Sequence, residues 1–331
     1  MKISVVGGGS WGSAFALHLG RMGIPTRLWI REKEVYQEIF NFKENKTFLP
    51  REKFPPEVIP CLDIKEAVQD SHIVFIAIPS QYCHFIYQQI KPFIASKQVL
   101  VSLTKGIENK SLMRMTEIIQ EIFSVRKMSE VAVLSGPSFA VEVARKHPTA
   151  VVIASKSMNC ARKIQHLISN QHFRAYTSTD IIGVEIAGAV KNVLAIATGI
   201  SDGIEFGYNS QAALITRGLA EMTRLGVKLG AKPATFAGLA GVGDLVLTCT
   251  GKLSRNHSVG YEIGQGKSLE EIVSRMKMVA EGISTTLSVR HLAQREKVDM
   301  PICEQVFNIL YNKKDPKQAL QELMSRALKE E

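Results

Sequence analysis

The residues best suited to chemistry lie in an apolar segment at 188–195, where Lys191 and Asn192 interrupt a run of small and apolar side chains. Lysines are rarely buried unless they have a partner. A desolvated ammonium can give a proton to a forming alkoxide, and the same amine can act as a base if burial or a second cation lowers its pKa. We therefore predict that Lys191 is the catalytic proton donor and acceptor, with Lys105 as a candidate second cation. The alternative is a lysine whose head reaches solvent.

A glycine-rich segment later in the chain could place a carboxylate beside this lysine. The segment 238–245 contains too many glycines for a good helix, so we expect a tight loop that fixes Asp244 in place. Asp244 could then orient the Lys191 ammonium or a substrate hydroxyl. The alternative is that Asp244 only caps the helix that follows.

The tripeptide Ser254-Arg255-Asn256 directly precedes a helical run at 257–263. A guanidinium and the free N–H groups of a helix start both suit a phosphate. We therefore predict a phosphate site here. The alternative is that Ser254 caps the helix and Arg255 is exposed to solvent.

The turn at 7–12 reads Gly-Gly-Gly-Ser-Trp-Gly, a G-x-G-x-x-G pattern that directly follows a strand-like run and precedes a helix-like one. In a dinucleotide site, Gly7 would allow the tight turn, Gly9 the approach of a pyrophosphate, and Gly12 the packing of the helix on the strand. The N–H groups at the helix start would face the anion. A glycine-rich turn without a ligand is the alternative.

Arg31 bears on the choice of cofactor, because it ends the strand-like run 26–30 where an NAD-selective site usually has an acidic residue. Arg31 could contact a 2′-phosphate, which favours NADPH over NADH. Glu32 follows directly and could take the acidic role, so both cofactors stay open. A solvated Arg31 is a further alternative.

Short β-rich runs alternate with helical segments in the first half of the chain. They lie at 3–6, 26–30, 73–78, 99–103, 131–134 and 150–154. Strands that alternate with helices imply a parallel sheet, and their nearly continuous Val and Ile content indicates burial on both faces. Ligands bind beyond the carboxyl ends of such strands, so the turns at 78–80, 104–106 and 135–140 should contact substrate and nicotinamide. For Ser80 a helix-capping role is the preferred interpretation, and Ser138 could also be a cap.

After about residue 179 the strand signal fades and helical apolar spacing takes over. The main runs are 181–200, 211–229, 284–294 and 303–310. We therefore predict an α/β protein with a doubly wound, Rossmann-type dinucleotide-binding domain at 1–180 and a mainly α-helical substrate and catalytic domain at 181–331. The segment 279–282 could close over the cofactor from the second domain, although a turn between helices would have the same pattern.

Composition restricts the class of protein. With 331 residues, 45% of them hydrophobic, the chain is long enough for about two domains. A net charge of +10 fits an enzyme for phosphorylated ligands. The Lys and Arg residues are scattered, without a dense basic arm, so no nucleic-acid partner is expected.

Localisation and metal content can also be predicted. The most apolar stretch, 183–200, is interrupted by Glu185 and Lys191, so no membrane span is expected. The first residues lack the apolar core of a signal peptide, which favours a cytoplasmic protein. The five cysteines lie too far apart in sequence for a zinc or redox motif, so no metal site is expected.

Taken together, the segments GGGSWGSA, TKG, SGPSFA, GAVKNVLAIATG, GLAGVGDLVLTC, SRN and VAEG resemble the bacterial NAD(P)-dependent glycerol-3-phosphate dehydrogenases. The resemblance covers nearly the whole chain, with Gly8 as a departure where the family more often has Ala. It implies an enzyme that interconverts dihydroxyacetone phosphate and sn-glycerol 3-phosphate with NADPH or NADH. It also implies a cytoplasmic homodimer that supplies glycerol 3-phosphate for phospholipid synthesis.

The resemblance also assigns roles to individual residues. The dinucleotide would contact Ser10, Trp11, Arg31, Ala140, Val279 and Glu281, in addition to Gly7, Gly9 and Gly12, with Lys105 and Arg255 also approaching it. The substrate would contact Lys105, Gly136, Ser138, Lys191 and Asp244, with its phosphate bound by Ser254, Arg255 and Asn256. Lys191 would be the proton acceptor in glycerol phosphate oxidation.

Two other interpretations use the same features. One is a two-domain reductase for another substrate, such as a 3-hydroxyacyl-CoA or ketopantoate enzyme. The former normally uses a His-Glu pair, and no His lies beside Lys191 in the sequence. The other is a regulator that senses NAD(P)H without turnover, which would have no need for a proton donor and a phosphate site.

Overall fold

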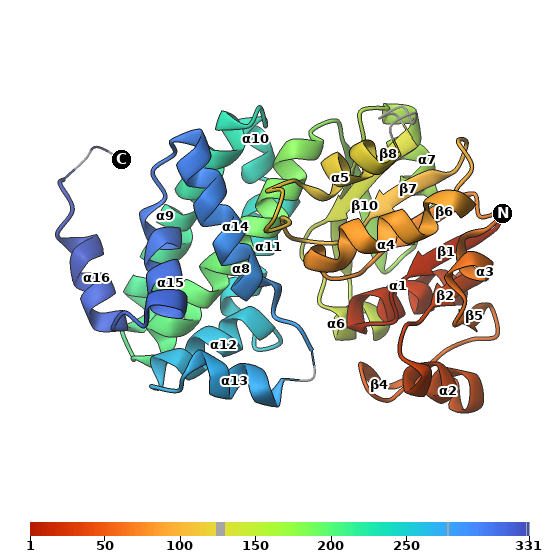
Figure 1. Ribbon diagram of the computed structural model, residues 1–331, viewed down its shortest axis with the longest axis horizontal. Coiled ribbons are helices and arrows are strands. Elements are labelled where there is room, and N and C mark those ends of the chain that lie inside the picture. The colour runs from red at the N-terminus through yellow and green to blue at the C-terminus, as the bar shows by residue number, and fades with distance from the viewer. Residues whose placement is uncertain (124–129, 277, 329, 331) are drawn as a thin grey trace.

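The computed structural model describes residues 1–123, 130–276, 278–328 and 330. Within these residues an α/β part and a helical part follow each other along the chain (Figure 1). The first part contains an eight-stranded sheet with the order β10-β9-β8-β7-β6-β1-β2-β5. Its strands are β1 (Ile3–Val6), β2 (Thr26–Trp29), β5 (Val58–Cys61), β6 (Ile73–Ile76), β7 (Val99–Ser102), β8 (Val131–Ser135), β9 (Thr149–Ala154) and β10 (Phe173–Ser178). Strands β3 (Glu44–Asn45) and β4 (Leu49–Lys53) form a separate antiparallel pair.

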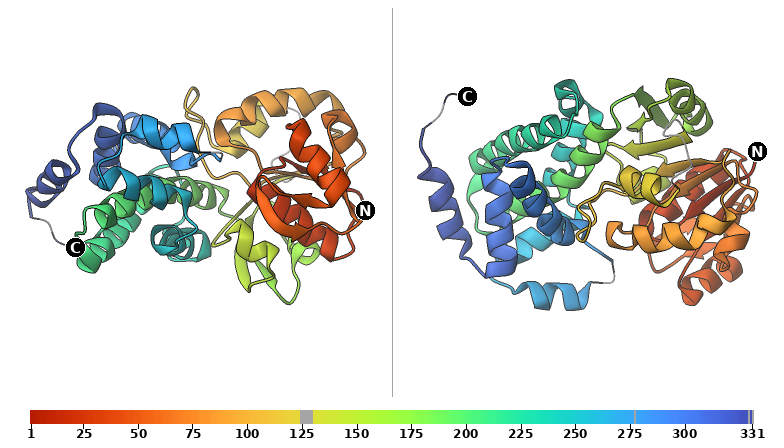
Figure 2. Two further views of the ribbon diagram at one scale, coloured as in Figure 1. Left: turned by 90° about the horizontal axis from the view of Figure 1, so that it is seen from below. Right: turned by 45° about the horizontal axis from the view of Figure 1, so that its top comes forward.

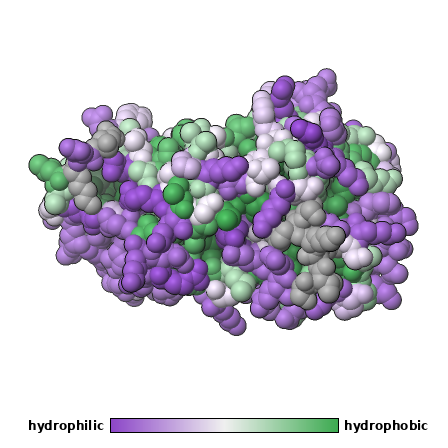
Figure 3. All heavy atoms as spheres, turned by 90° about the horizontal axis from the view of Figure 1, so that it is seen from above, coloured by the Kyte–Doolittle hydropathy of each residue, from purple (hydrophilic) through white to green (hydrophobic). Residues whose placement is uncertain are grey.

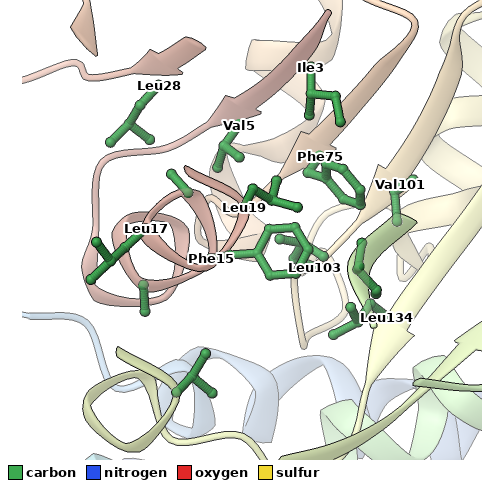
Figure 4. Close-up of a cluster of buried hydrophobic side chains, with 14 of the residues drawn as sticks. Ile3, Val5, Phe15, Leu17, Leu19, Leu28, Phe75, Val101, Leu103 and Leu134 are labelled. Atoms are coloured by element: carbon green, nitrogen blue, oxygen red, sulfur yellow. The ribbon is translucent and has the colours of Figure 1, made fainter. Parts of the chain in front are cut away.

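Helices cover both faces of this sheet because successive strand residues point to opposite sides and both sets are apolar. On one face, Val5 and Phe75 pack against Phe15 (Figure 4). This face carries helices α1 (Ser10–Arg21), α2 (Lys33–Phe42), α6 (Ala140–Ala144) and α7 (Met158–Ile168). On the other face, Val74 and Ile76 pack with side chains of α3 (Ile64–Val68), α4 (Cys83–Ile90) and α5 (Met115–Ile122).

The helical part is built around α8 (Ile181–Gly203) (Figure 2). The helices packed against α8 are α9 (Gly207–Lys228), α10 (Pro233–Phe236), α11 (Asp244–Thr250), α12 (Arg255–Gly264), α14 (Glu281–Glu296) and α15 (Pro301–Asn312). Outside them, α13 (Leu269–Arg275) packs on α12, and α16 (Pro316–Met324) packs on α15 (Figure 1). Helix α12 lies against α8 with almost no side chain between them. A Cβ on Gly199 would lie 2.1 Å from the carbonyl oxygen of His257, and a Cβ on Gly260 would lie 2.1 Å from that of Ile196. These glycines bring the start of α12 close to the helix that carries Lys191.

The expected class, a Rossmann-type sheet followed by helices, is confirmed, but the prediction of a parallel sheet is wrong at one strand pair. Strand β9 runs antiparallel to β8, whereas the other neighbours in the eight-stranded sheet are parallel. The only helix between β8 and β9 is α6, which has five residues and is about 7.5 Å long. It is too short to return the chain across the sheet, so β9 starts from the edge where β8 ended.

Two other local expectations differ from the structure. Strands β5 and β10 lie at the edges of the sheet and were not expected, because Val-Ile-Pro-Cys and Phe-Arg-Ala-Tyr-Thr-Ser lack the continuous apolar pattern of the inner strands. The tight loop expected at 238–245 is instead a π-helical turn, Leu239–Gly243, which leads directly into α11. Such turns are rare and frequently found at functional sites.

Two segments, α8 and 233–250, have the length and apolar composition of a membrane span. Composition alone does not separate such a span from a core helix. In α8, 94% of the most apolar window is buried inside the protein, and the second segment is divided among α10, the π-helical turn and α11. The face in Figure 3 shows hydrophilic side chains over much of its area, with apolar ones among them.

All five cysteines are free thiols.

Candidate active site

Lys191 lies in the buried middle of α8 and contacts a carboxylate that a second lysine shares. Its Nζ lies 2.9 Å from Oδ1 of Asp244, whose Oδ2 lies 2.6 Å from Nζ of Lys105. The Lys191 side chain is 7% exposed and that of Asp244 is 1% exposed, so the alternative of a lysine that reaches solvent is wrong. Lys105 also donates to the carbonyl oxygen of Gly136 at 2.9 Å. Because Lys105 and Gly136 follow β7 and β8, the Lys191 amine lies at the carboxyl edge of the sheet.

The π-helical turn and α11 place the groups that orient Lys191. Asp244 is the first residue of α11, and Thr248 lies one turn later on the same face. Lys191 donates to Oγ1 of Thr248 at 2.7 Å, and Thr248 donates to the carbonyl oxygen of Asp244 at 2.6 Å. Thr248 was not among the predicted site residues. Its spacing of four residues from Asp244 was the signal that could have identified it.

Burial and mutual charge set the protonation of this cluster. Burial lowers the pKa of Lys191 to about 8, with Asp244 opposing the shift and Lys105 adding to it. For Asp244, burial would raise the pKa, but the two lysines outweigh it and keep its pKa below the ordinary value. The carboxylate is therefore charged at neutral pH. An amine with a pKa near 8 can both give and take a proton near neutral pH.

A chain of amide hydrogen bonds connects this cluster to α12 and α14. Asn192 donates to the carbonyl oxygen of Lys105 at 3.4 Å and accepts from Nδ2 of Asn256 at 3.0 Å. Oδ1 of Asn256 accepts the N–H of Gly282 at 2.9 Å. Asn192 was noted in the sequence only as a neighbour of Lys191. In the structure it links the lysine cluster to the predicted phosphate site.

At the predicted phosphate site, the side chain of Ser254 caps α12 by accepting the N–H of His257 at 3.2 Å. The capping alternative therefore describes Ser254 correctly. Arg255, the next residue, is exposed, and its Nη1 donates to the carbonyl oxygen of Val279 at 3.1 Å. Asn256 is buried and faces Asn192. The start of α12 thus offers helix N–H groups and one guanidinium beside the lysine cluster.

The glycine-rich turn has the geometry that a dinucleotide needs. Gly7 has a φ of +122°, and a Cβ there would lie 2.4 Å from the carbonyl oxygen of Ala77. A Cβ on Gly12 would lie 1.9 Å from the carbonyl oxygen of Gly7, whereas one on Gly9 would meet nothing within 4 Å. The turn is therefore closely packed on the sheet and open at Gly9, where a pyrophosphate would approach.

Two polar side chains at the start of α1 lie beside the turn, Ser10 and Trp11. Ser10 starts α1 and its hydroxyl donates to the sulfur of Met278 at 3.0 Å. Among the described residues, the indole Nε1 of Trp11 is buried without a hydrogen-bond partner. A buried polar atom without a partner is rare in folded proteins and is consistent with a ligand contact. The residues of the turn thus fit the predicted dinucleotide.

Arg31 lies beyond the end of β2, away from the lysine cluster. Its guanidinium is 2.6 Å from Oε1 of Glu32 and 6.0 Å from the ring centre of Tyr82. The Arg31 side chain is 65% exposed. The Arg31 cation and the Glu32 carboxylate are therefore both present where the adenosine ribose would lie. This position suits NADPH as well as NADH.

The turns after β6 and β8 contain the other predicted contacts. The expected role of Ser80 as a helix cap is wrong. Its N–H and Oγ donate to the carboxylate of Glu281, with the Oγ contact at 2.6 Å. This contact crosses from the sheet to the start of α14. Ser138 donates to the carbonyl oxygen of Gly136 at 2.9 Å rather than capping α6, which starts at Ala140. The sequence around Ser80 favours a cap because its partner, Glu281, is 201 residues away in the chain.

A glycine-rich turn and a buried lysine of a helical second part lie at the same carboxyl edge of a Rossmann-type sheet. Together they define a two-domain dinucleotide-dependent oxidoreductase. Residues 2–161 match the model of the NAD-dependent glycerol-3-phosphate dehydrogenase N-terminus, and residues 180–321 match that of its C-terminus. The chain therefore belongs to the NAD-dependent glycerol-3-phosphate dehydrogenase family.

Individual relatives agree with this assignment. The protein named glycerol-3-phosphate dehydrogenase [NAD(P)+] in Syntrophobacter fumaroxidans is 48% identical over 99% of this chain and 97% of its own length. The protein of the same name in Citrifermentans bemidjiense is 49% identical over 100% of this chain and 98% of its own length. A crystal structure of glycerol-3-phosphate dehydrogenase from Coxiella burnetii has a TM-score of 0.95 and 41% identity, covering 98% of this chain and 99% of that one.

Proposed function

We propose that this chain interconverts dihydroxyacetone phosphate and sn-glycerol 3-phosphate with NADPH or NADH as its cofactor. The observation that carries the proposal is the buried cluster of Lys191, Asp244 and Lys105 at the same carboxyl edge of the sheet as the glycine-rich turn. A bound nicotinamide would supply or accept the hydride at this edge. Loss of NADPH absorbance on addition of dihydroxyacetone phosphate tests it, and a protein that binds NADPH without turnover would be a sensor instead.

In this proposal the side chains around the substrate have distinct tasks. Lys191 gives its proton to the C2 oxygen of dihydroxyacetone phosphate as the alcohol forms, and takes it back in oxidation. Asp244 and Thr248 orient the amine through the contacts described above. Lys105 lowers the proton affinity of Lys191 and presents a second cation to the substrate, next to Gly136 and Ser138.

The substrate phosphate is assigned to the start of α12. Arg255 would form a charge-assisted contact with it, and the first N–H groups of the helix would donate to its oxygens. Ser254 keeps the helix start in shape by capping it, and Asn256 connects it to Asn192 and so to Lys191. This arrangement would fix the distance between the phosphate and the reacting carbon.

Cofactor contacts are assigned to the glycine-rich turn and its surroundings. Gly7, Gly9, Gly12 and the start of α1 at Ser10 and Trp11 would hold the pyrophosphate. Further contacts are proposed at Arg31 for the ribose, at Lys105 and Ala140 near the nicotinamide, and at Arg255, Val279 and Glu281 from the second domain. Domains of 1–180 and 181–331 would then close around the cofactor.

Replacing Arg255 by alanine should raise the KM for dihydroxyacetone phosphate by roughly 10- to 150-fold, because a hydrogen bond to a charged group contributes about 1.5–3 kcal/mol. Steady-state kinetics at saturating NADPH measures this. Arg275→Ala removes an equal charge from an exposed position at the end of α13 and should leave the KM unchanged. Equal KM values for both variants would place the phosphate elsewhere.

The direction of the reaction should determine its pH dependence. Reduction needs the protonated Lys191 ammonium, so its rate should be constant below the pKa of about 8 and fall as the pH rises through it. Oxidation needs the neutral amine, so its rate should rise over the same interval. Profiles of kcat/KM in both directions measure this, and two profiles that change in the same direction would exclude Lys191 as the titrating group.

The assembly and cellular role are also proposals. We propose a cytoplasmic homodimer that supplies glycerol 3-phosphate for phospholipid synthesis. The family assignment supports this role, since the relatives described above carry the corresponding enzyme name. A particle of twice the chain mass of 36.6 kDa in light scattering is expected, and a monomer at working concentration would contradict the dimer.

A further inference from the structure

A second buried ion pair joins the catalytic helix to the first domain. Glu185 on α8 is fully enclosed, with its side chain 4% exposed, and Oε2 lies 2.5 Å from Nη1 of Arg114. Its Oε1 accepts the N–H of Thr116 at 2.8 Å, and Oε2 accepts the Thr116 hydroxyl at 2.7 Å. Arg114 uses its other terminal nitrogen for Glu117 on α5, at 2.7 Å. The carboxylate of Glu185 is thus fixed at the start of α5 by three donors.

Glu185 shares one face of α8 with two other residues that contact the first domain, Gly188 and Asn192. Residues three and seven positions apart lie on one side of a helix, so Glu185, Gly188 and Asn192 form a row. A Cβ on Gly188 would lie 2.9 Å from Oγ of Ser135, and Asn192 donates to the carbonyl oxygen of Lys105. Glu185 is the charged member of this row. Its contacts restrict both the rotation of α8 and its movement along its axis.

We propose that Glu185 is a positioning residue, which sets the place of Lys191 at the sheet edge by fixing α8 against the start of α5. The inference rests on the proposed role of Lys191 in turnover. Lys191 lies six residues, about 9 Å, further along the same helix. A shift of α8 at Glu185 therefore moves the amine relative to the substrate, while Lys105 and the glycine-rich turn stay with the sheet.

The chain contains a matched control, Glu221 on α9. Like Glu185, it is a buried carboxylate that accepts hydrogen bonds from the start of another helix. The donors are the N–H groups of Ile302 and Cys303 in α15, at 2.7 and 3.2 Å. Burial raises the pKa of both carboxyl groups. Glu221 holds α15 against α9 within the second domain and contacts neither α8 nor the sheet through these bonds. Its loss should affect stability without moving Lys191.

The experiment compares Glu185→Gln with Glu221→Gln at a temperature well below the melting temperature of each variant. Glu185→Gln should lower kcat for dihydroxyacetone phosphate reduction on the order of 10- to 100-fold, because small misplacements of catalytic groups have effects of this size. The Kd for NADPH should be unchanged. Glu221→Gln should lower the melting temperature but keep the wild-type kcat. If Glu185→Gln also keeps the wild-type kcat, its role is only structural and the proposal is wrong.

Thr116→Val is the milder second variant if Glu185→Gln does not fold, since it removes one hydroxyl contact and leaves the ion pair. It should lower kcat in the same direction by a smaller factor, and a wild-type kcat would count against the proposal. A crystal structure of Glu185→Gln, or of Thr116→Val if that variant replaces it, separates this inference from the proposed function. Even if the wild-type protein does not reduce dihydroxyacetone phosphate, the proposal requires the Lys191 amine to shift relative to Lys105 and the sheet. An amine that keeps its place relative to Lys105 would overturn it.

Discussion

Replacing Lys191 by alanine should lower kcat for dihydroxyacetone phosphate reduction by about 10²- to 10⁴-fold, the usual contribution of a positioned general acid. The side chain is the amine at the sheet edge that Asp244 and Thr248 both orient, so its removal takes away the oriented proton donor. NADPH should bind with wild-type affinity, because the glycine-rich turn is untouched. Steady-state kinetics and fluorescence titration with NADPH measure the two effects.

A surface variant provides the control for Lys191→Ala. Lys228 lies exposed in the last turn of α9, and Lys228→Ala removes the same charge from the chain. It should turn over like the wild type. Addition of a small primary amine to Lys191→Ala should restore part of the activity, since the amine can enter the space that the side chain leaves. Near-wild-type turnover of Lys191→Ala without added amine would remove Lys191 from the mechanism.

Of the proposed variants, Asp244→Asn should lower the free energy of unfolding most. It should also lose turnover. The substitution leaves two buried or half-buried ammonium groups, Lys191 and Lys105, without their shared carboxylate. Breaking a buried ion pair costs about 3–5 kcal/mol of unfolding free energy. The pKa of Lys191 should also fall below about 8, because Asp244 is the group that raises it most. Denaturant unfolding and the pH profile of reduction measure the two changes.

An acid-to-amide change elsewhere tests whether this effect is specific. Asp315 caps α16 by accepting the N–H of Gln318, and asparagine caps helices about as well as aspartate. Asp315→Asn should therefore leave stability and the pH profile near wild type. If Asp244→Asn unfolds at the same denaturant concentration as Asp315→Asn, the two lysines do not depend on Asp244 as described.

The inner strands and the long helices could be predicted because their patterns are local. Strand β1 occupies the predicted 3–6, and α8 begins at the predicted residue and runs three residues beyond the predicted end. The direction of β9 could not be predicted, since it depends on how far the chain travels between strands. The π-helical turn before Asp244 was read as a loop because glycine content shows poor helix propensity but not the hydrogen-bond pattern that results.

At the candidate site, the sequence was sufficient to identify the reactive side chains but not the hydrogen bonds that join distant segments. Lys191, Asp244 and Lys105 were expected to lie together, and the structure brings them together. Thr248 was missed, as were the bonds from Ser80 to Glu281 and from Arg114 to Glu185. The last two pairs are 201 and 71 residues apart in the chain. No local pattern marks such pairs, because each residue has an ordinary role when considered alone.

In the proposed mechanism the Lys191 amine reaches the oxygen that gains the proton. A crystal structure of the complex with NADPH and glycerol 3-phosphate would show this contact. We expect the C2 hydroxyl oxygen within hydrogen-bond distance of Lys191 Nζ, at about 2.7–3.2 Å, with the phosphate at the start of α12 beside Arg255. A C2 oxygen bound by another side chain, with Lys191 still bonded only to Asp244 and Thr248, would contradict it.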